Sequence, residues 1–328
     1  MSSLDDFDRE LLNEIQQQFP LEAYPYHRLA SVLDARSEKV MDRIRALKES
    51  GIIRQLSAIF DTRKLGYKSS LVAMEVKPDK LVEVADAISR HPGVSHNYER
   101  NHKFNLWFTI AVPPRHSIQD EVNWFSELDG VRATRMLPTL RMFKIGVKLD
   151  MSTKNKQEVK PSETKREIRQ EPFGGTERDK EFVRELQKDL PVVERPFLQM
   201  ANNLDTTEEG VFSRLRYYEE TGIMRRYAAI LRHRDAGFLA NGMIVWKVPD
   251  DIIENIGERL GAFPQVSHCY QRPAYPDWPY TVFSMIHCRT RDEASQIAKT
   301  IQSQIGIEHY NILFSEREFK KSRVEYFV

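Results

Sequence analysis

The segment Val94-Ser95-His96-Asn97-Tyr98-Glu99-Arg100 returns later in the chain as Val266-Ser267-His268-Cys269-Tyr270-Gln271-Arg272. In both copies a histidine, a tyrosine and an arginine are spaced two residues apart, which places the three side chains on one face of a β-strand. An imidazole, a phenol and a guanidinium together suit an anionic ligand that exchanges protons. The sequence therefore predicts two related sites.

The repeat extends well beyond this motif. Glu49-Ser50-Gly51-Ile52-Ile53-Arg54 matches Glu220-Thr221-Gly222-Ile223-Met224-Arg225 at a spacing of 171 residues, one fewer than for the motif. A period of this length indicates two duplicated domains and not a solenoid. The polar residues 150–175 between the copies predict a flexible linker, with a solvated helix as the alternative. Either form tethers the two halves and favours their pairing within one chain.

Each copy begins with helices and continues with alternating strands and helices. In the first copy, apolar residues at helical spacing predict helices over 5–18, 27–33 and 37–49, the last capped by Ser37 and stopped by Gly51. Three short helices followed by the strand 52–60 are typical of a winged helix-turn-helix. The β-α-β-β-α-β order that follows, ending in a strand over 131–147, predicts a ferredoxin-like sandwich.

The predicted class is therefore α+β, with each half of the chain built from a helix-turn-helix and a ferredoxin-like domain. The predicted domains are a winged helix-turn-helix over 1–60, a ferredoxin-like domain over 61–149, the linker over 150–175, a second winged helix-turn-helix over 176–231 and a second ferredoxin-like domain over 232–328.

The amino-acid composition argues against several classes of protein. The 328 residues are 41% hydrophobic and 30% charged, with a formal net charge of +1. Such a balance is typical of a globular protein and argues against one that coats nucleic acid. The chain has two cysteines, and neither an apolar leader nor a run long enough to cross a bilayer is visible. We expect a cytoplasmic protein with no membrane partner.

Two helical segments resemble the Lrp/AsnC-type regulators. They are the run from Leu4 to Leu12 and the run from Ser37 to Ile53. The resemblance implies a winged helix-turn-helix joined to a ferredoxin-like domain that pairs with a second copy. Nearly the whole chain fits that layout twice.

The helices that would read DNA carry little positive charge. The first has Lys39, Arg43, Arg45 and Lys48 beside several carboxylates, and the second opens with Glu208 and Glu209. A duplex would meet negative charge there, whereas recognition helices need cations toward the phosphates. We therefore expect these segments to act as scaffold and not to bind DNA.

The ferredoxin-like segments resemble the paired subunits of siroheme decarboxylases, here fused in one chain as in the forms associated with haem d1 synthesis. The motif strings 96–100 and 268–272 carry the resemblance, together with the aromatic stretches 104–109 and 275–287. It implies a carbon–carbon lyase that removes the ring C and ring D acetate carboxylates of siroheme. The products would be 12,18-didecarboxysiroheme and CO2, with no cofactor beyond the iron tetrapyrrole that is itself the substrate.

The residue types present suit that chemistry. A histidine has the pKa of a proton donor near neutral pH and is also a common axial ligand of iron, so His96 or His268 would serve in either role. Tyr98 and Tyr270 would relay protons or hold a carboxylate. Arg100 and Arg272 would anchor carboxylates through their forked guanidinium groups.

Further residues are candidates for binding the flat, multiply charged substrate: Arg54, Arg225, Arg226, Trp107, Trp278, Tyr280 and His287, with Arg135 and Arg141 also considered. Each has a structural alternative. An arginine often forms only a surface ion pair, an aromatic ring often packs in a core, and His287 lies in an apolar run where core histidines occur.

Other interpretations stay open from the residues alone. The chain is alternatively a haem-responsive transcriptional regulator, or a tetrapyrrole carrier without catalysis. The sequence also leaves open which histidine ligates iron, whether one or both sites work and which acetate leaves first. It does not distinguish a haem d1 from a haem b pathway, or a monomer from a homodimer.

Overall fold

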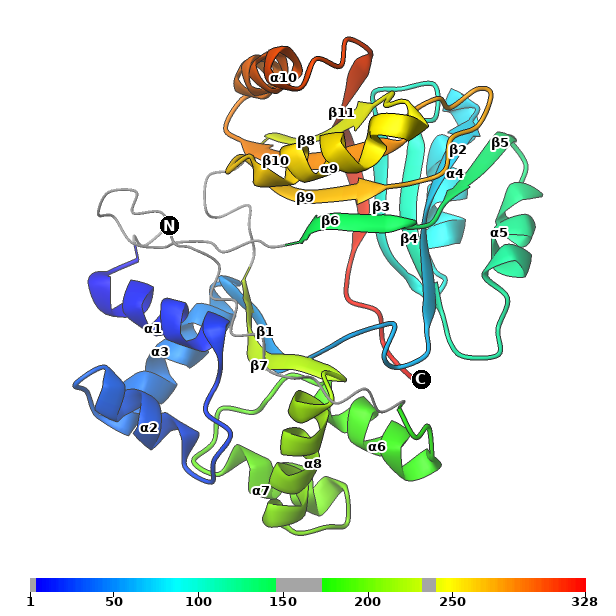
Figure 1. The fold of residues 1–328 in the computed structure, drawn as a ribbon. Coiled ribbons are helices and arrows are strands. Elements are labelled where there is room, and N and C mark those ends of the chain that lie inside the picture. Colours follow the sequence, from blue (N-terminus) through cyan, green and yellow to red (C-terminus); the bar gives the residue numbers. More distant parts are fainter. Residues whose placement is uncertain (1–3, 146–172, 232–239) are drawn as a thin grey trace. The chain divides into compact units, whose positions relative to one another are not determined.

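The computed structural model describes residues 4–145, 173–231 and 240–328, which form two compact units. The helical unit comprises 4–66, 173–231 and 325–328, and the sheet unit comprises 67–145 and 240–324. Each unit therefore contains one part of both copies (Figure 1). The predicted linker falls almost wholly outside the described residues.

The helical unit contains three helices and one strand from each copy: α1 (Asp6–Gln17), α2 (Pro25–Val32), α3 (Ser37–Glu49), β1 (Ile53–Phe60), α6 (Glu177–Leu186), α7 (Pro196–Asn203), α8 (Glu208–Glu220) and β7 (Met224–Leu231). Gly51 follows α3 with a φ of 78°, as predicted for a glycine that ends a helix. The prediction that Ser37 caps α3 was wrong. The N-cap is Arg36, whose side chain makes no capping hydrogen bond.

The strand expected to act as a wing pairs with its counterpart in the other copy. β1 runs antiparallel to β7, with Ser57 opposite Ala228. The turns after the first helices extend this exchange, because Phe19 N donates to Tyr227 O and Leu190 N donates to Leu56 O. The two helix-turn-helix segments are thus joined through one two-stranded sheet. Pairing of the halves within the chain is confirmed here.

The sheet unit contains two ferredoxin-like domains. The first has β2 (Lys68–Val76), α4 (Leu81–Ser89), β3 (Val94–Arg100), β4 (Leu106–Val112), α5 (Ile118–Ser126), β5 (Val131–Leu137) and β6 (Arg141–Ile145). The second has β8 (Ala240–Trp246), α9 (Ile253–Ala262), β9 (Val266–Gln271), β10 (Val282–Cys288), α10 (Arg291–Ile305) and β11 (Tyr310–Lys321). The 3₁₀ turns η1 (Pro78–Lys80) and η3 (Asp250–Ile252) precede α4 and α9. The predicted β-α-β-β-α-β order is confirmed in both domains.

The last strand of each domain crosses to the other domain. The nine strands are ordered β5-β2-β4-β3-β11-β8-β10-β9-β6. The first part of β11 pairs with β8 of its own domain and the second part with β3 of the other. The stretch predicted as one strand over 131–147 is likewise two strands, since β5 pairs with β2 and β6 with β9.

This exchange curls the sheet. Only residues 138–140 separate β5 from β6, although these strands form opposite edges of the nine. Because so short a segment spans roughly 14 Å at most, the two edges must lie close together. The inner faces of the curled sheet enclose an apolar core that includes Trp107, Leu137, Trp278 and Phe283.

Helices cover the outer faces. α4 and α5 pack on the strands of the first domain and α9 and α10 on those of the second, each pair over its own apolar core (Figure 1). The sheet unit is therefore layered, with the two halves of the sheet facing each other, α4 and α5 outside one half, and α9 and α10 outside the other. Among the described residues, no helix is long and apolar enough to cross a membrane.

Candidate active site

The two motif strands present their histidine, tyrosine and arginine away from the helices. On β3 the alternate residue Asn97 points to α4, where its Nδ2 donates to Ala85 O at 3.0 Å. On β9 Cys269 points to α9, with its Sγ 3.7 Å from Gly257 O. The motif side chains occupy the opposite face of each strand, as the two-residue spacing predicts. That face is the inner side of the sandwich.

Ring geometry is the same at both sites. The rings of His96 and Tyr98 have centroids 6.1 Å apart and planes inclined by 33°, and the values for His268 and Tyr270 are identical. The Cζ atom of Arg100 lies 5.8 Å from the Tyr98 ring centroid. The arrangement of a histidine beside a tyrosine therefore occurs twice, as the sequence indicates.

Arg100 is buried and Arg272 is partly buried, and each is held by the other domain. Arg100 Nη1 donates to Leu313 O on β11 at 2.8 Å, and Arg272 Nη1 donates to Leu137 O on β5. Burial lowers the pKa of both guanidinium groups to about 10. Within the described part of the chain, neither arginine pairs with a carboxylate and neither Nε has a hydrogen-bond partner. Two guanidinium groups largely shielded from water, with no counter-ion among the described residues, suit an anionic ligand.

A serine hydroxyl contacts each motif histidine. Ser95 Oγ lies 3.0 Å from His96 Nδ1, and Ser267 Oγ lies 3.0 Å from His268 Nδ1. At the second site the same oxygen also lies 2.9 Å from His287 Nε2. His287 reaches it from β10, the neighbour of β9.

The strand on the other side of each motif differs between the sites. β11 places Glu318 opposite Tyr98 and Lys321 opposite His96. β6 places Met142 opposite Tyr270 at the second site, with its side chain 43% exposed. Directly paired residues lie on the same face of a sheet. Both sites are therefore assembled from both copies, one beside charged residues and the other beside an apolar one.

The predicted aromatic platform is packed into the core of the sandwich. Trp107 is buried, and its Nε1 donates to Phe104 O at 2.6 Å. Trp278 is fully buried, with its ring centroid 5.1 Å from that of Trp107 and 5.0 Å from that of Tyr280. A role for these rings in ligand binding stays a prediction, since the packing observed here is that of a core.

The second copy has an insertion between β9 and β10, where residues 272–281 stand in place of the shorter segment 101–105 of the first copy. This insertion carries Trp278 and is anchored to the first domain. Arg135 donates to both carboxylate oxygens of Asp277, at 2.8 and 2.7 Å. Tyr275 Oη donates to Met136 O at 2.6 Å. Arg135 is therefore occupied by a structural ion pair.

The remaining predicted arginines lie elsewhere. Arg54, Arg225 and Arg226 belong to β1 and β7 of the helical unit and not to the unit that holds the motifs. Arg225 pairs with Asp61 at 2.8 Å. Although burial opposes it, this guanidinium lowers the pKa of Asp61. Arg141, on β6, pairs with Glu254.

Two arginines of the helix-turn-helix segments form ion pairs within their own segment. Arg43 on α3 donates to Asp8 at 3.1 Å, and Arg214 on α8 donates to Asp179 at 2.9 Å. Asp8 and Asp179 belong to the capping boxes of α1 and α6. These contacts support the expectation that α3 and α8 act as scaffold, because the cations are neutralised where DNA phosphates would need them.

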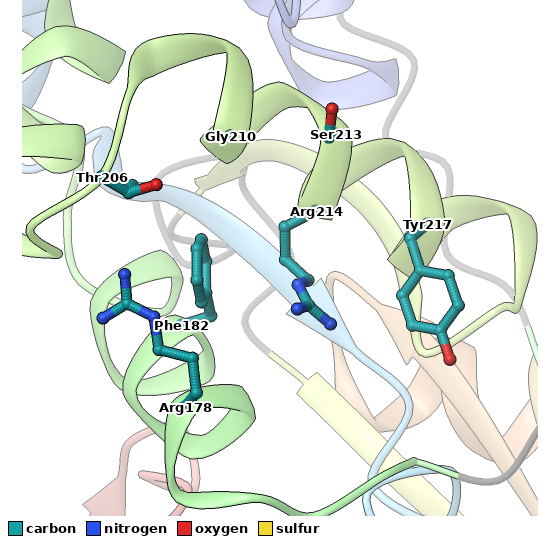
Figure 2. Close-up of a pocket in the computed structure, with 7 residues that line it drawn as sticks. All are labelled: Arg178, Phe182, Thr206, Gly210, Ser213, Arg214 and Tyr217. Carbon is teal, nitrogen blue, oxygen red and sulfur yellow. The ribbon is translucent and has the colours of Figure 1, made fainter.

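The second helix-turn-helix has a surface pocket of about 500 Å³ between α6 and α8 (Figure 2). Its lining residues are Arg178, Phe182, Thr206, Gly210, Ser213, Arg214 and Tyr217. Both arginines are already paired, Arg178 with Glu181 and Arg214 with Asp179. At the equivalent place in the first copy, Lys39 lies over the Phe7 ring at 3.9 Å. The pocket therefore presents no unpaired charge and is a weaker candidate than the motif strands.

Some residues near the motifs escaped sequence reasoning. Ser95 and Ser267 stand beside the histidines in the quoted repeat, and their presence in both copies was the signal available. Glu318, Lys321 and Met142 gave no local signal, because they reach the motifs only through strands of the other domain. No group of three or more potential metal ligands occurs among the residues that the structure describes.

Comparisons with known proteins agree with this architecture. The model of the AsnC-like ligand binding domain matches residues 64–144 and 235–320, and that of the siroheme decarboxylase NirDL-like HTH domain matches 8–54 and 179–225. A siroheme decarboxylase of Hydrogenobacter thermophilus is 42% identical over 98% of this chain and 95% of its own length.

Two further relatives bear on the duplication and the ligand. The siroheme decarboxylase beta subunit of Methanosarcina barkeri is 42% identical over 44% of this chain and 96% of its own length, so one half matches a separate subunit. A crystal structure of the siroheme decarboxylase NirDL in co-complex with an iron-uroporphyrin III analogue has a TM-score of 0.78. It is 37% identical and covers 99% of this chain and 95% of the other. The chain therefore belongs to the siroheme decarboxylase family.

Proposed function

We propose that this protein decarboxylates siroheme, removing the ring C and ring D acetate carboxylates to give 12,18-didecarboxysiroheme and two molecules of CO2. The observation that carries the proposal is the pair of shielded arginines, neither of which has a counter-ion among the described residues. Arg100 shares a face of β3 with His96 and Tyr98, and Arg272 directly follows β9, which carries His268 and Tyr270. Membership of the family and the porphyrin complex of a relative support the same substrate class.

The reaction needs a proton for each carboxylate lost. The bond between the acetate methylene and its carboxylate carbon breaks, CO2 leaves, and the electron pair stays on the methylene carbon. A proton then converts that carbon to a methyl group. No net oxidation occurs, so the protein must supply a proton donor and a place for the anion.

The motif residues divide these tasks. An imidazole of His268 or His96 supplies the proton, because its ordinary pKa lies near neutrality. Arg100 and Arg272 anchor substrate carboxylates by charge-assisted hydrogen bonds, with Tyr98 and Tyr270 beside them. The same histidines are the candidates for an axial ligand of the substrate iron.

The test is anaerobic incubation of the purified protein with siroheme, followed by mass analysis of the extracted tetrapyrrole. We expect the loss of two CO2 units. His268→Ala and His96→Ala are compared with His27→Ala, an exposed histidine of α2. The His27 variant should keep wild-type turnover, and at least one motif variant should lose it while its circular dichroism stays unchanged.

Other outcomes distinguish the rival functions. Siroheme that binds tightly and is recovered unchanged would identify a carrier and overturn the enzyme proposal. Full activity in both motif variants would remove the histidines from the mechanism.

A further inference from the structure

The hydroxyl of Ser267 is surrounded by three polar atoms. It lies 3.1 Å from Met285 O, 3.0 Å from His268 Nδ1 and 2.9 Å from His287 Nε2. The oxygen has one hydrogen to donate and two lone pairs with which to accept. Its three neighbours therefore match its full hydrogen-bonding capacity.

Counting hydrogens assigns the imidazole tautomers. A main-chain oxygen can only accept, so the hydrogen bond to Met285 O takes the serine hydrogen. Both imidazole nitrogens that face the serine must then donate to it. In its neutral form His268 consequently carries its hydrogen on Nδ1 and its lone pair on Nε2, so Nε2 is the nitrogen that must first take up a proton before His268 can supply it to the substrate. Neutral His287 carries its hydrogen on Nε2.

The first site lacks this arrangement. Ser95 contacts His96 in the same way, but the residue equivalent to His287 is Ala111. This equivalence follows from the register, because Met285 is opposite His268 on β10 and Thr109 is opposite His96 on β4. His287 and Ala111 each lie two residues beyond those partners.

The strands that flank the two motifs also differ. At the first site β11 places Glu318 opposite Tyr98 and Lys321 opposite His96, so charged residues of both signs stand beside the motif. At the second site the half-exposed Met142 offers a polarisable apolar surface suited to a flat macrocycle.

We propose that Ser267 is a positioning residue that holds His268 and His287 as a pair, and that this pair makes the site on β9 the one at which the carbon–carbon bonds break. The proposal rests on the proposed function. Ser267 acts through the imidazoles: it fixes which nitrogen of His268 faces the substrate and does not itself touch the reacting atoms. Hydrogen-bond partners that orient a metal-ligating histidine typically contribute about 10- to 100-fold to activity, and we expect an effect of the same order for Ser267.

The first experiment compares Ser267→Ala, Ser267→Thr and the matched control Ser95→Ala in the full-length protein. Turnover of siroheme is followed anaerobically by mass analysis, and siroheme affinity is measured by absorbance titration. We expect Ser267→Ala to lower kcat about 10- to 100-fold while the Kd for siroheme changes less than about twofold. Ser267→Thr, which keeps the hydroxyl, should restore most of kcat. Ser95→Ala should lose far less.

A second measurement does not depend on activity. Nitrogen NMR of histidine-labelled protein reports which ring nitrogen is protonated, and His268→Gln identifies the His268 signals. The Nδ1-protonated form of His268 should predominate in the wild type and lose that predominance in Ser267→Ala. A merely structural serine would leave this ratio unchanged.

The outcomes separate the two proposals. Wild-type protein that leaves siroheme intact would overturn the proposed function itself. Active wild-type protein with equal losses in Ser267→Ala and Ser95→Ala would overturn the inference alone, as would a Ser267→Ala variant with full kcat or a Ser267→Thr variant that fails to recover although folded.

Discussion

Arg100 donates a hydrogen bond from Nη1 to the main-chain oxygen of Leu313 across 2.8 Å, and Arg272 donates in the same way to Leu137. In both cases the acceptor lies on a strand of the other domain, β11 for Arg100 and β5 for Arg272. The packing of the two domains therefore does more than join the halves, because it supplies an acceptor that fixes each motif guanidinium in place. A carbonyl carries no net charge, so each cation stays available for an anion.

Replacing these arginines should affect binding more than stability. Arg272→Met and Arg100→Met remove a desolvated charge but also the hydrogen bonds to the main-chain oxygens of Leu137 and Leu313. Because these effects oppose each other, we expect the free energy of unfolding to change by no more than about 1 kcal/mol. Loss of charge-assisted hydrogen bonds to a carboxylate should weaken siroheme binding at least about tenfold in one or both variants. Urea unfolding and absorbance titration measure the two effects. Arg132→Met, at an exposed arginine, serves as the control. Arg100 or Arg272 variants that lose stability but bind siroheme normally when folded would contradict the prediction that binding is affected more than stability.

The ion pair between Arg135 and Asp277 should stabilise the insertion in a pH-dependent way. The guanidinium holds the pKa of Asp277 below its ordinary value of 3.8, chiefly by hydrogen bonding. A carboxylate with a lowered folded-state pKa contributes its stability above 3.8 and loses it as the pH falls through the folded value. Asp277→Asn should therefore cost about 0.5–1 kcal/mol at neutral pH and less in strong acid, measured by chemical unfolding. A cost that does not depend on pH would show that the amide fails for steric reasons.

Separately produced halves should depend on each other. In residues 173–328 alone, the second part of β11 lacks its neighbour β3, and in residues 1–148 alone β3 lacks β11. Unpaired strands of this kind promote aggregation. We expect the co-expressed halves to co-purify as a one-to-one complex, measured by light scattering, and each half alone to aggregate. Two halves that each stay soluble and monomeric, and that do not associate when mixed, would contradict the observed strand exchange.

Duplex DNA should bind weakly at most. Because Arg43 and Arg214 are neutralised by the capping carboxylates Asp8 and Asp179, we expect fluorescence anisotropy with a random duplex to give a Kd no tighter than about 1 μM at physiological salt. Nanomolar, sequence-dependent binding would return the regulator interpretation. Asp179→Ala, which releases Arg214, should tighten the non-specific binding if the ion pair is what limits it.

Local sequence patterns predicted much of the fold. Helical spacing located α1 and α3, and Gly51 marked the end of α3, because these signals act within a few residues. The repeat indicated the duplication, and the order of helices and strands indicated the ferredoxin-like domains. The pattern failed at residues 131–147, where one predicted strand is two. The change of neighbour at 138–140 depends on the other domain. Pro138, which has no N–H to donate to a ladder, was the local signal that the prediction did not use.

The candidate site likewise has features that local sequence predicts and features that depend on the tertiary structure. By itself the sequence determined the two motifs and the face that each presents, because alternation along a strand is a local property of the backbone. Only the tertiary structure decided that β11 and β6 flank them, that Leu313 and Leu137 hold the arginines and that Ser267 meets His287. The contacts of β11, β6, Leu313 and Leu137 depend on the packing of two whole domains, whose strands are distant in the chain. The contact between Ser267 and His287 depends on the register of β9 with β10. Neither is set by the residues of one strand alone.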